Sequence, residues 1–350
     1  MVKRGAYRKL YILLLALIVC GTLWCFHLRE GFQETTRKLY PVGFSFPEEK
    51  MITYIPEKTK LLSDIIPGRV SNYTYKTEEE YYNEYRTSIF ATTTKKNGWD
   101  CLRHYEIIGN GSIPYFPGIE DCPKNTMTLF PKELVVKGNE LYKRISAKGI
   151  NDLSEDERTE CNQMIQSHLD HMRAHLTTTK MAEYILDKAG KTNVSSILFI
   201  SAKTEPDYLR CTILHGFKSL LGNKCHDYPK IEHIYKSGEK DYTGLYGRGF
   251  TYTNLLDQSM YDNALDNTIK EDIENKKYDI VIYGTAWHAN ALEFNTQTGK
   301  SMFESGRPYY DSVRRAYKPE EVILLCGYDI HDCDYENEIQ HGNHIFVREL

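Results

Sequence analysis

The sequence lacks any excess of positive charge. Its 44 Lys and Arg residues are offset by 48 Asp and Glu residues, which gives a formal net charge of -4. Proteins that bind nucleic acid usually concentrate basic residues, so we expect no nucleic acid among the partners. Internal repeats and low-complexity tracts are also missing, and the 41% of hydrophobic residues suffice for a sizeable core. The bulk of the chain is therefore expected to fold.

A CxxC pair or any other zinc-like cysteine spacing is absent as well. Two of the nine cysteines, Cys20 and Cys25, fall in an apolar N-terminal run, so seven remain. An odd number of cysteines cannot all pair within one chain. Two interpretations stay open for them: isolated disulfides, such as Cys211 with Cys225, or buried free thiols.

The N-terminus has the pattern of a membrane anchor. Residues 1–9 carry four basic residues and no acid, and the apolar run Leu10–Phe26 follows. This run is long enough to span a thin bilayer, and the positive charge before it places residues 1–9 in the cytoplasm. A cleaved signal peptide is the alternative, but the run exceeds a usual signal h-region and no small-x-small cleavage site follows it.

We therefore predict an uncleaved signal anchor over residues 10–28 and a single-pass type II membrane protein. The rest of the chain would lie on the far side of the membrane, which in a eukaryotic cell is the lumen of the endoplasmic reticulum or Golgi. Sequons for N-glycosylation at Asn72, Asn110 and Asn193 fit that location.

Beyond the anchor, the pattern predicts a polar stem over residues 29–50 and a first folded region over residues 51–190. Within the first region we expect a helix over Glu78–Tyr85 and a strand over Ser88–Thr92. A helix over Trp99–Ile108, ended by Asn110-Gly111, and a strand over Ser112–Phe116 follow. Apolar residues near helical spacing predict one long helix over residues 160–188.

Strands alternate with helices in the second region, residues 191–350. The apolar run Ser196–Ser201 is typical of a strand buried on both faces, and further strands are expected over Asp279–Tyr283 and Val322–Cys326. Helices should follow the first strand, up to Gly222, and occupy residues 265–276 and 312–317. This alternation predicts a parallel sheet, whose ligands bind at the carboxyl ends of its strands.

The most specific stretch is GWDCLRHYEIIGNGSIPYF, residues 98–116. A helix that starts near Trp99 would offer its N–H groups and positive dipole end to a phosphate. Arg103, one turn in, adds a forked donor for a diphosphate, and Glu106 on the same face can accept hydrogen bonds from ribose hydroxyls. Gly109 and Gly111 permit a tight turn and a close approach of backbone to ligand. From the spacing alone, an Arg103–Glu106 ion pair on the surface of an ordinary helix is the simpler interpretation.

This stretch resembles the nucleotide-sugar-binding motif of glycosyltransferases of the two-domain GT-B architecture, including exostosin-like enzymes, in which a helix with Arg and "YE" precedes "aGxIPv". A wider part of the chain resembles poorly described glycosyltransferase-like proteins of bacteria, algae and large DNA viruses. This part comprises residues 88–134 and the later segments PDYLRCTILHGFKSLLG, DYPKIEHIY and LYGRGFTYT. The resemblance implies that Glu106 binds the ribose and Arg103 the diphosphate of a nucleotide sugar. It also implies an α/β fold of two Rossmann-like regions, GT-B-like and in permuted order.

Two residues are candidates for the catalytic base, which must remove a proton from the acceptor hydroxyl. In GT-B enzymes the loop after the first strand of such a region faces the acceptor, and here that loop leads to Asp207. Asp207 is also a good helix N-cap, and that interpretation is favoured. His288, which follows the strand ending at Tyr283, is the second candidate.

Two further segments have weaker patterns. The glycine-rich piece Gly244–Gly249 could wrap a phosphate with the help of Arg248, although a plain turn is favoured. Asp332 and Asp334 have the spacing of a motif that holds Mn or Mg in another glycosyltransferase fold. Too little chain follows them to build the acceptor half, so we favour a solvated acidic turn. We accordingly assign no metal ligand and expect no cofactor to be required, with a divalent ion as the less favoured alternative.

Together these patterns predict a membrane-anchored glycosyltransferase. Its partners would be a nucleotide-sugar donor, a glycan or glycoprotein acceptor, and the lipid bilayer through residues 10–28. The alternative is a non-catalytic anchored binding protein that retains the fold.

Overall fold

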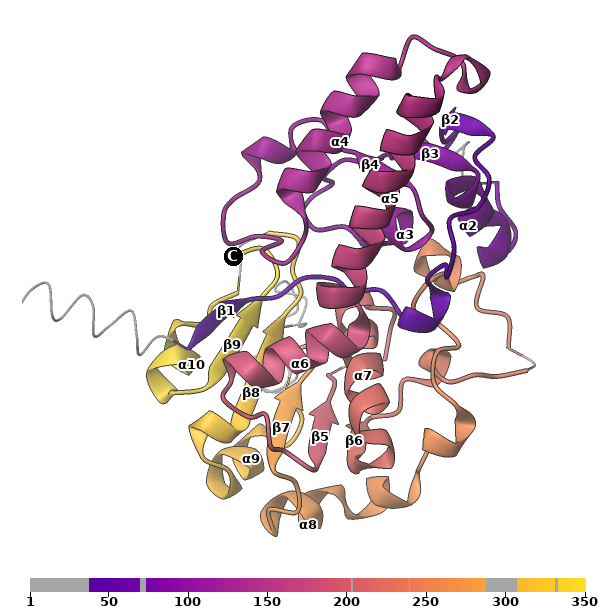
Figure 1. Cartoon of the computed structure of the whole chain (residues 1–350). Helices are drawn as coiled ribbons and strands as arrows, with labels where there is room; N and C mark the ends of the chain where they lie inside the picture. Colours follow the sequence, from indigo (N-terminus) through magenta and orange to yellow (C-terminus); the bar gives the residue numbers. More distant parts are fainter. Residues whose placement is uncertain (1–37, 70–73, 203, 239, 288–306, 331–332) are drawn as a thin grey trace, which may run out of the picture. The chain divides into compact units, whose positions relative to one another are not determined.

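The secondary structure alternates short parallel strands with helices (Figure 1). A computed structural model describes residues 38–69, 74–202, 204–238, 240–287, 307–330 and 333–350. Its strands are β1 Leu39–Pro41, β2 Lys60–Leu62, β3 Ser88–Thr92, β4 Ile113–Tyr115, β5 Ile197–Ile200, β6 Cys225–Tyr228, β7 Ile280–Tyr283, β8 Val322–Cys326 and β9 His344–Val347. Its α-helices are α2 Glu78–Arg86, α3 Leu102–Gly109, α4 Lys132–Ile145, α5 Glu155–His175, α6 Thr178–Lys188, α7 Tyr208–Leu221, α8 Ile269–Glu274, α9 Tyr310–Ala316 and α10 Glu336–His341.

The larger sheet has six parallel strands in the order β1-β9-β8-β7-β5-β6. Successive residues of a strand point to opposite faces, and β5 follows this rule. Ile197 and Phe199 belong to a buried apolar cluster with residues of α6 and α7. Leu198 and Ile200 belong to a second cluster, with residues of α8 and α9. Helices therefore cover both faces, which explains why β5, β7 and β8 are continuous apolar runs and confirms the prediction of an α/β fold with a parallel sheet.

The smaller sheet has three parallel strands in the order β2-β3-β4. Helix α3 connects β3 to β4, and α4 and α5 both contact β4. The predicted bounds of β3 are confirmed, and β4 is one residue shorter at each end than expected. Residues of this sheet share the same buried cluster as α6 and α7. Residues 39–350 accordingly form one compact unit.

Residues 39–50 were expected to belong to a stem, and this expectation was wrong. Leu39–Pro41 forms the edge strand β1 beside β9, and Val42 continues the pairing by donating to Val347 O at 3.0 Å. The side chains of Phe44 and Phe46 are buried. Val42, Phe44 and Phe46 do alternate with small or polar residues, but the paired residues Leu39–Pro41 precede that alternation and include a proline, which is disfavoured within strands.

The helix predicted over residues 160–188 is in fact two helices. Helix α5 ends at His175 and α6 begins at Thr178, where the Thr177 side chain caps the backbone N–H of Lys180. The backbone of Phe46 bridges the gap: its N–H donates to Leu176 O at 2.9 Å, and its carbonyl accepts from Thr178 N at 3.1 Å. The break therefore depends on a segment more than 100 residues away in the sequence.

Both cysteine states that the sequence left open, an isolated disulfide and buried free thiols, occur in the structure. Cys326 and Cys333 form a disulfide. Cys211 and Cys225, the pair named as an example, are not bonded to each other and are buried free thiols. Among the residues that the structure describes, no helix is both long and apolar enough to cross a bilayer. The predicted anchor, Leu10–Phe26, lies outside the described residues.

Candidate functional site

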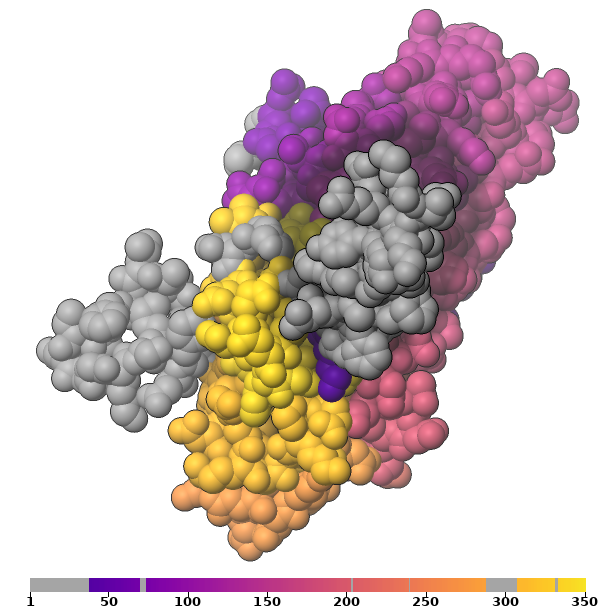
Figure 2. All heavy atoms as spheres, turned by 90° about the vertical axis from the view of Figure 1, so that its left-hand side faces the viewer, coloured from indigo at the N-terminus to yellow at the C-terminus, as the bar shows by residue number. Residues whose placement is uncertain are grey.

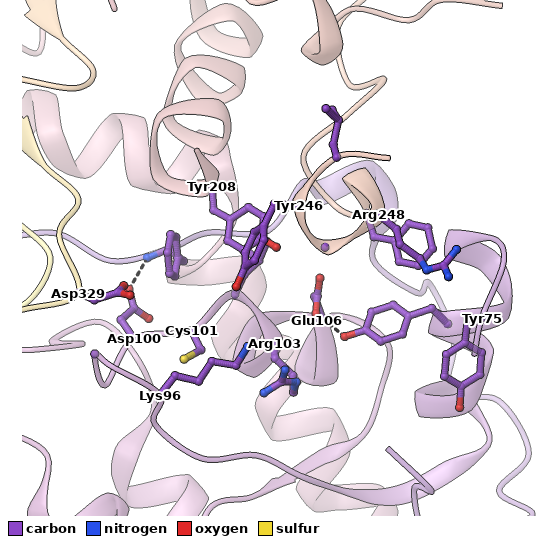
Figure 3. A pocket seen from close by; sticks show the side chains of 17 residues that line it. Tyr75, Lys96, Asp100, Cys101, Arg103, Glu106, Tyr208, Tyr246, Arg248 and Asp329 are labelled. Carbon is purple, nitrogen blue, oxygen red and sulfur yellow. Dashed lines mark hydrogen bonds between the residues drawn. The ribbon is translucent and has the colours of Figure 1, made fainter. Parts of the chain in front are cut away.

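A cavity of about 570 Å³ lies where the carboxyl ends of strands from both sheets come together (Figure 3). The smaller sheet contributes the loop after β3 and the start of α3. The larger sheet contributes the start of α7 after β5, the segment 245–250 after β6, and Asp329 after β8. This is the edge at which parallel α/β sheets bind ligands. The polar and aromatic side chains that line the cavity include Tyr75, Tyr81, Lys96, Asp100, Arg103, Glu106, Tyr208, Tyr246, Arg248 and Asp329.

Helix α3 presents its first turn to this cavity. It starts at Leu102 and not at Trp99, so Arg103 is its second residue and lies closer to the helix N-terminus than expected. Cys101 is the N-cap residue and gives the helix no side-chain cap. Because Cys101, Leu102 and Arg103 all line the cavity, the positive end of the helix dipole lies at the cavity wall.

Arg103 and Glu106 are both buried, at 8% and 7% exposure, and both line the cavity. A surface ion pair, the alternative interpretation of the motif, does not fit this burial. The Glu106 carboxylate accepts a hydrogen bond from the Tyr81 hydroxyl at 2.7 Å and another from Thr251 Oγ1 at 2.5 Å. Burial raises the pKa of Glu106, although these two bonds and the charge of Arg103 act in the opposite direction.

The glycine-rich segment after β6 reaches the same cavity. Gly247 and Arg248 both have positive φ, and a Cβ on Gly247 would lie 2.2 Å from the Tyr208 hydroxyl oxygen. Thr251 has a φ of 74°, which is strained for a β-branched residue. Its N–H donates to Glu78 and its hydroxyl to Glu106, so these bonds hold the strained backbone in place. The segment thereby brings exposed Arg248 to the cavity that Arg103 lines.

Aromatic rings form another part of the wall. The rings of Tyr208 and Tyr246 lie 5.6 Å apart, and the rings of Phe44 and Tyr208 lie 6.0 Å apart. Tyr246 is 66% exposed, which is high for so large an aromatic residue. Aromatic faces of this kind can stack on bases and on the apolar faces of sugar rings.

Asp100 is a cavity residue that the sequence analysis missed. It is 2% exposed, and its carboxylate accepts hydrogen bonds from Phe44 N at 2.7 Å and from the Tyr105 hydroxyl at 2.9 Å. Burial raises the pKa of the Asp100 carboxyl to about 6, against the opposing charge of Arg348. Its place directly before a motif helix, three residues before Arg103, was the available signal.

The C-terminal residues fix the backbone around Asp100. The Glu349 carboxylate accepts from Asp100 N at 2.9 Å and from Trp99 N at 3.1 Å, and Arg348 donates to Asp100 O at 2.6 Å. Thr126 also donates to Leu350 O at 2.9 Å. Yellow atoms of the C-terminal segment accordingly adjoin purple atoms of the smaller sheet's region in the space-filling view (Figure 2). The cavity is thus held together by contacts between residues about 250 positions apart.

Comparison of the chain with protein-family models, with curated proteins and with solved structures gave no match.

The other predicted site residues lie elsewhere. Asp207 is the N-cap of α7, where its carboxylate accepts from Arg210 N at 2.8 Å, and it is not among the residues that line the cavity. Gly109 and Gly111 lie at the far end of α3, where each leaves room for a neighbouring side chain. A Cβ on Gly109 would lie 2.6 Å from the ring of Phe46, and a Cβ on Gly111 would lie 2.3 Å from Ile52 Cδ1. These glycines therefore serve packing and not a ligand in the cavity.

His288 and Asp332 lie outside the described residues. In the part of the chain that the structure describes, no group of three or more His, Cys, Asp or Glu side chains could hold a metal ion.

Proposed function

We propose that the protein is a membrane-anchored glycosyltransferase that moves a sugar from a nucleotide-sugar donor to a glycan or glycoprotein acceptor. One observation carries this proposal: Arg103 and Glu106, on successive turns of α3, are both buried in the wall of one cavity. Lys96 and Arg248 also line this cavity. A cavity with cations, a carboxylate and aromatic rings suits a nucleoside diphosphate sugar better than an apolar ligand.

Each part of the donor has a chemically suitable partner. The Glu106 oxygens each retain a further acceptor position for a ribose hydroxyl, since a carboxylate offers about four such positions. Arg103, Lys96 and Arg248 can bind the diphosphate together with the N-terminus of α3. Cations placed there would stabilise the negative charge that develops on the departing diphosphate, which is the main electrostatic demand of the reaction.

The two parallel sheets support a GT-B-like arrangement of two Rossmann-like regions in permuted order. Residues 51–190 would be the donor-binding region and residues 191–350 the second region. In this arrangement the carboxyl ends of strands in both regions face one shared cavity, as the lining residues from β3, β5, β6 and β8 do.

A second candidate is a non-catalytic anchored binding protein that retains this fold. It is favoured by the fact that both Glu106 oxygens already accept hydrogen bonds from Tyr81 and Thr251. Such bonds could serve only to hold the cavity wall together.

A donor screen separates the two candidates. Full-length protein in detergent is incubated with UDP- and GDP-sugars, and release of the nucleoside diphosphate is measured. For the transferase we expect release with at least one donor and a loss of about 100-fold or more in Glu106→Ala. Arg144→Gln, which changes an exposed residue of α4 paired with Glu160, should behave like wild type. Binding of UDP or GDP without turnover would support the second candidate, and unchanged turnover in Glu106→Ala would remove this site assignment.

A further inference from the structure

We propose that Asp100 is the general base of the transfer, the group that takes the proton from the acceptor hydroxyl. This inference rests on the proposed function and assigns to Asp100 the role that the sequence pattern offered to Asp207 or His288. It is carried by the place of Asp100 in the cavity, by the contacts that hold its carboxylate, and by the engagement of the neighbouring carboxylates elsewhere.

The position of Asp100 matches the end of the cavity at which the transferred sugar would lie. Asp100 directly precedes the N-cap of α3, Arg103 is in its first turn and Glu106 in its second. In Figure 3, Lys96 and Arg103 lie between Asp100 on one side and Glu106 on the other. A donor with its ribose at Glu106 and its diphosphate at Arg103 would extend its sugar toward Asp100.

The carboxylate is fixed but not saturated. From the part of the chain that the structure describes, its two oxygens accept one hydrogen bond each, from Phe44 N and from the Tyr105 hydroxyl. A carboxylate can accept about four hydrogen bonds, so one acceptor position on each oxygen remains for a hydroxyl in the cavity. Two well-made bonds from the chain hold the group in one orientation, which general-base catalysis needs.

The charged and titratable groups that face Asp100 come from three elements. Tyr105 lies on α3 and Cys101 is its N-cap, Arg348 and Glu349 follow β9, and Cys122 follows the short helical turn Ile119–Asp121. Burial is the strongest influence and raises the pKa of the carboxyl, while the Arg348 charge lowers it and the Glu349 charge raises it. A carboxyl with a pKa of about 6 is ionised at neutral pH and is a stronger base than an exposed aspartate.

The other carboxylates near the cavity are engaged differently. Asp207 caps α7 and does not line the cavity. Asp329 lines it but is exposed and paired with Arg348. Glu106 lies at the opposite end of the cavity, and its carboxylate accepts hydrogen bonds from Tyr81 and Thr251. Among the described lining residues, Asp100 is therefore the carboxylate that is both buried and close to the expected sugar.

The step balances as a single displacement. The acceptor oxygen forms a bond to the anomeric carbon of the donor sugar while its proton passes to an Asp100 oxygen. The bond from the anomeric carbon to the diphosphate oxygen breaks, and its electron pair leaves with the diphosphate, whose charge Arg103 and Lys96 neutralise. Attack opposite to the leaving group inverts the anomeric centre, so the enzyme should invert configuration.

The test compares Asp100→Asn with Asp170→Asn in full-length protein. Asp170 is an exposed carboxylate on α5, paired with Arg173, and serves as the matched control. With the UDP- or GDP-sugar that wild type turns over, we expect kcat of Asp100→Asn to fall about 100-fold or more. The Kd of the corresponding nucleoside diphosphate, measured by calorimetry, should stay within about twofold, because the Asn oxygen can still accept from Phe44 N while its amide group donates to the Tyr105 hydroxyl. Asp170→Asn should match wild type in both measurements.

Two further measurements use wild-type protein alone, so they do not depend on whether a variant folds. The kcat of wild type should fall below about pH 6, and the product should have the anomeric configuration opposite to that of the donor. Full turnover in Asp100→Asn, or a product that retains configuration, would overturn the role of Asp100 and leave the proposed function standing. Failure of wild type to bind UDP and GDP would instead contradict the proposed function, and this inference with it.

Discussion

At the scale of single residues, Asp100 and Glu106 are carboxylates that the fold removes from water at the two ends of one cavity. Their burial is unfavourable for the charged form, and it raises the pKa of both groups. Residues that destabilise a fold in this way are concentrated at functional sites, where a shifted pKa has a use. For Asp100 the direction of the shift also fixes how stability should depend on pH.

The folded-state pKa of Asp100 is raised, so its neutral form is the one that the fold favours. The stability from this group is fully present below its ordinary pKa of 3.8 and is lost as the pH rises through about 6. Asparagine resembles the neutral form at every pH. We therefore expect the free energy of unfolding of Asp100→Asn, relative to wild type, to be higher at pH 8 than at pH 5 by about 1 kcal/mol. Urea unfolding of both proteins at pH 5 and pH 8 measures this difference. A larger difference at pH 5 than at pH 8 would mean that the surroundings stabilise the carboxylate form of Asp100.

At the scale of elements, the segment from Leu245 to Thr251 combines backbone strain with bonds to the site. Positive φ at Thr251 is unfavourable by about 1–2 kcal/mol, and its hydroxyl bond to Glu106 offsets this. Thr251→Val keeps the strain and removes the hydroxyl, whereas Thr251→Gly removes both. We expect Thr251→Val to be the less stable variant by about 1 kcal/mol in urea unfolding. A Thr251→Val variant that is as stable as Thr251→Gly or more stable would contradict this expectation.

Elements whose cause is local could be predicted from the sequence. The buried strands β5, β7 and β8 are continuous apolar runs, and α2 and α7 start at the capping residues Thr77 and Asp207. Strand β6, with sequence CHDY, has no such pattern, and the break between α5 and α6 depends on the distant Phe46 backbone. The residues of the candidate site also differ in whether a local motif or distant contacts determine their place. Arg103 and Glu106 share one motif, but the burial of Asp100 depends on Phe44 and on the C-terminal residues.

At the scale of the whole molecule, the predicted lumenal location can be tested through the sequons. Asn193 is exposed, whereas Asn110 is fully buried and its side-chain amide donates to Glu106 O at 2.9 Å. We expect Asn193→Gln, in protein expressed in eukaryotic cells, to lose one glycan that an endoglycosidase removes from wild type. Asn110→Gln should lose none. A glycan on Asn110, or none on Asn193, would contradict the lumenal location or the burial at α3.

The central claim is that the first turn of α3 binds the phosphates of a sugar donor, and calorimetric titration of full-length protein with UDP and GDP tests it most directly. Wild type should bind one of the two nucleotides, and Arg103→Gln should bind it about tenfold more weakly or worse because a forked donor to the diphosphate is lost. Arg144→Gln should bind like wild type. Absence of binding to both nucleotides, or equal binding by Arg103→Gln and wild type, would contradict the account.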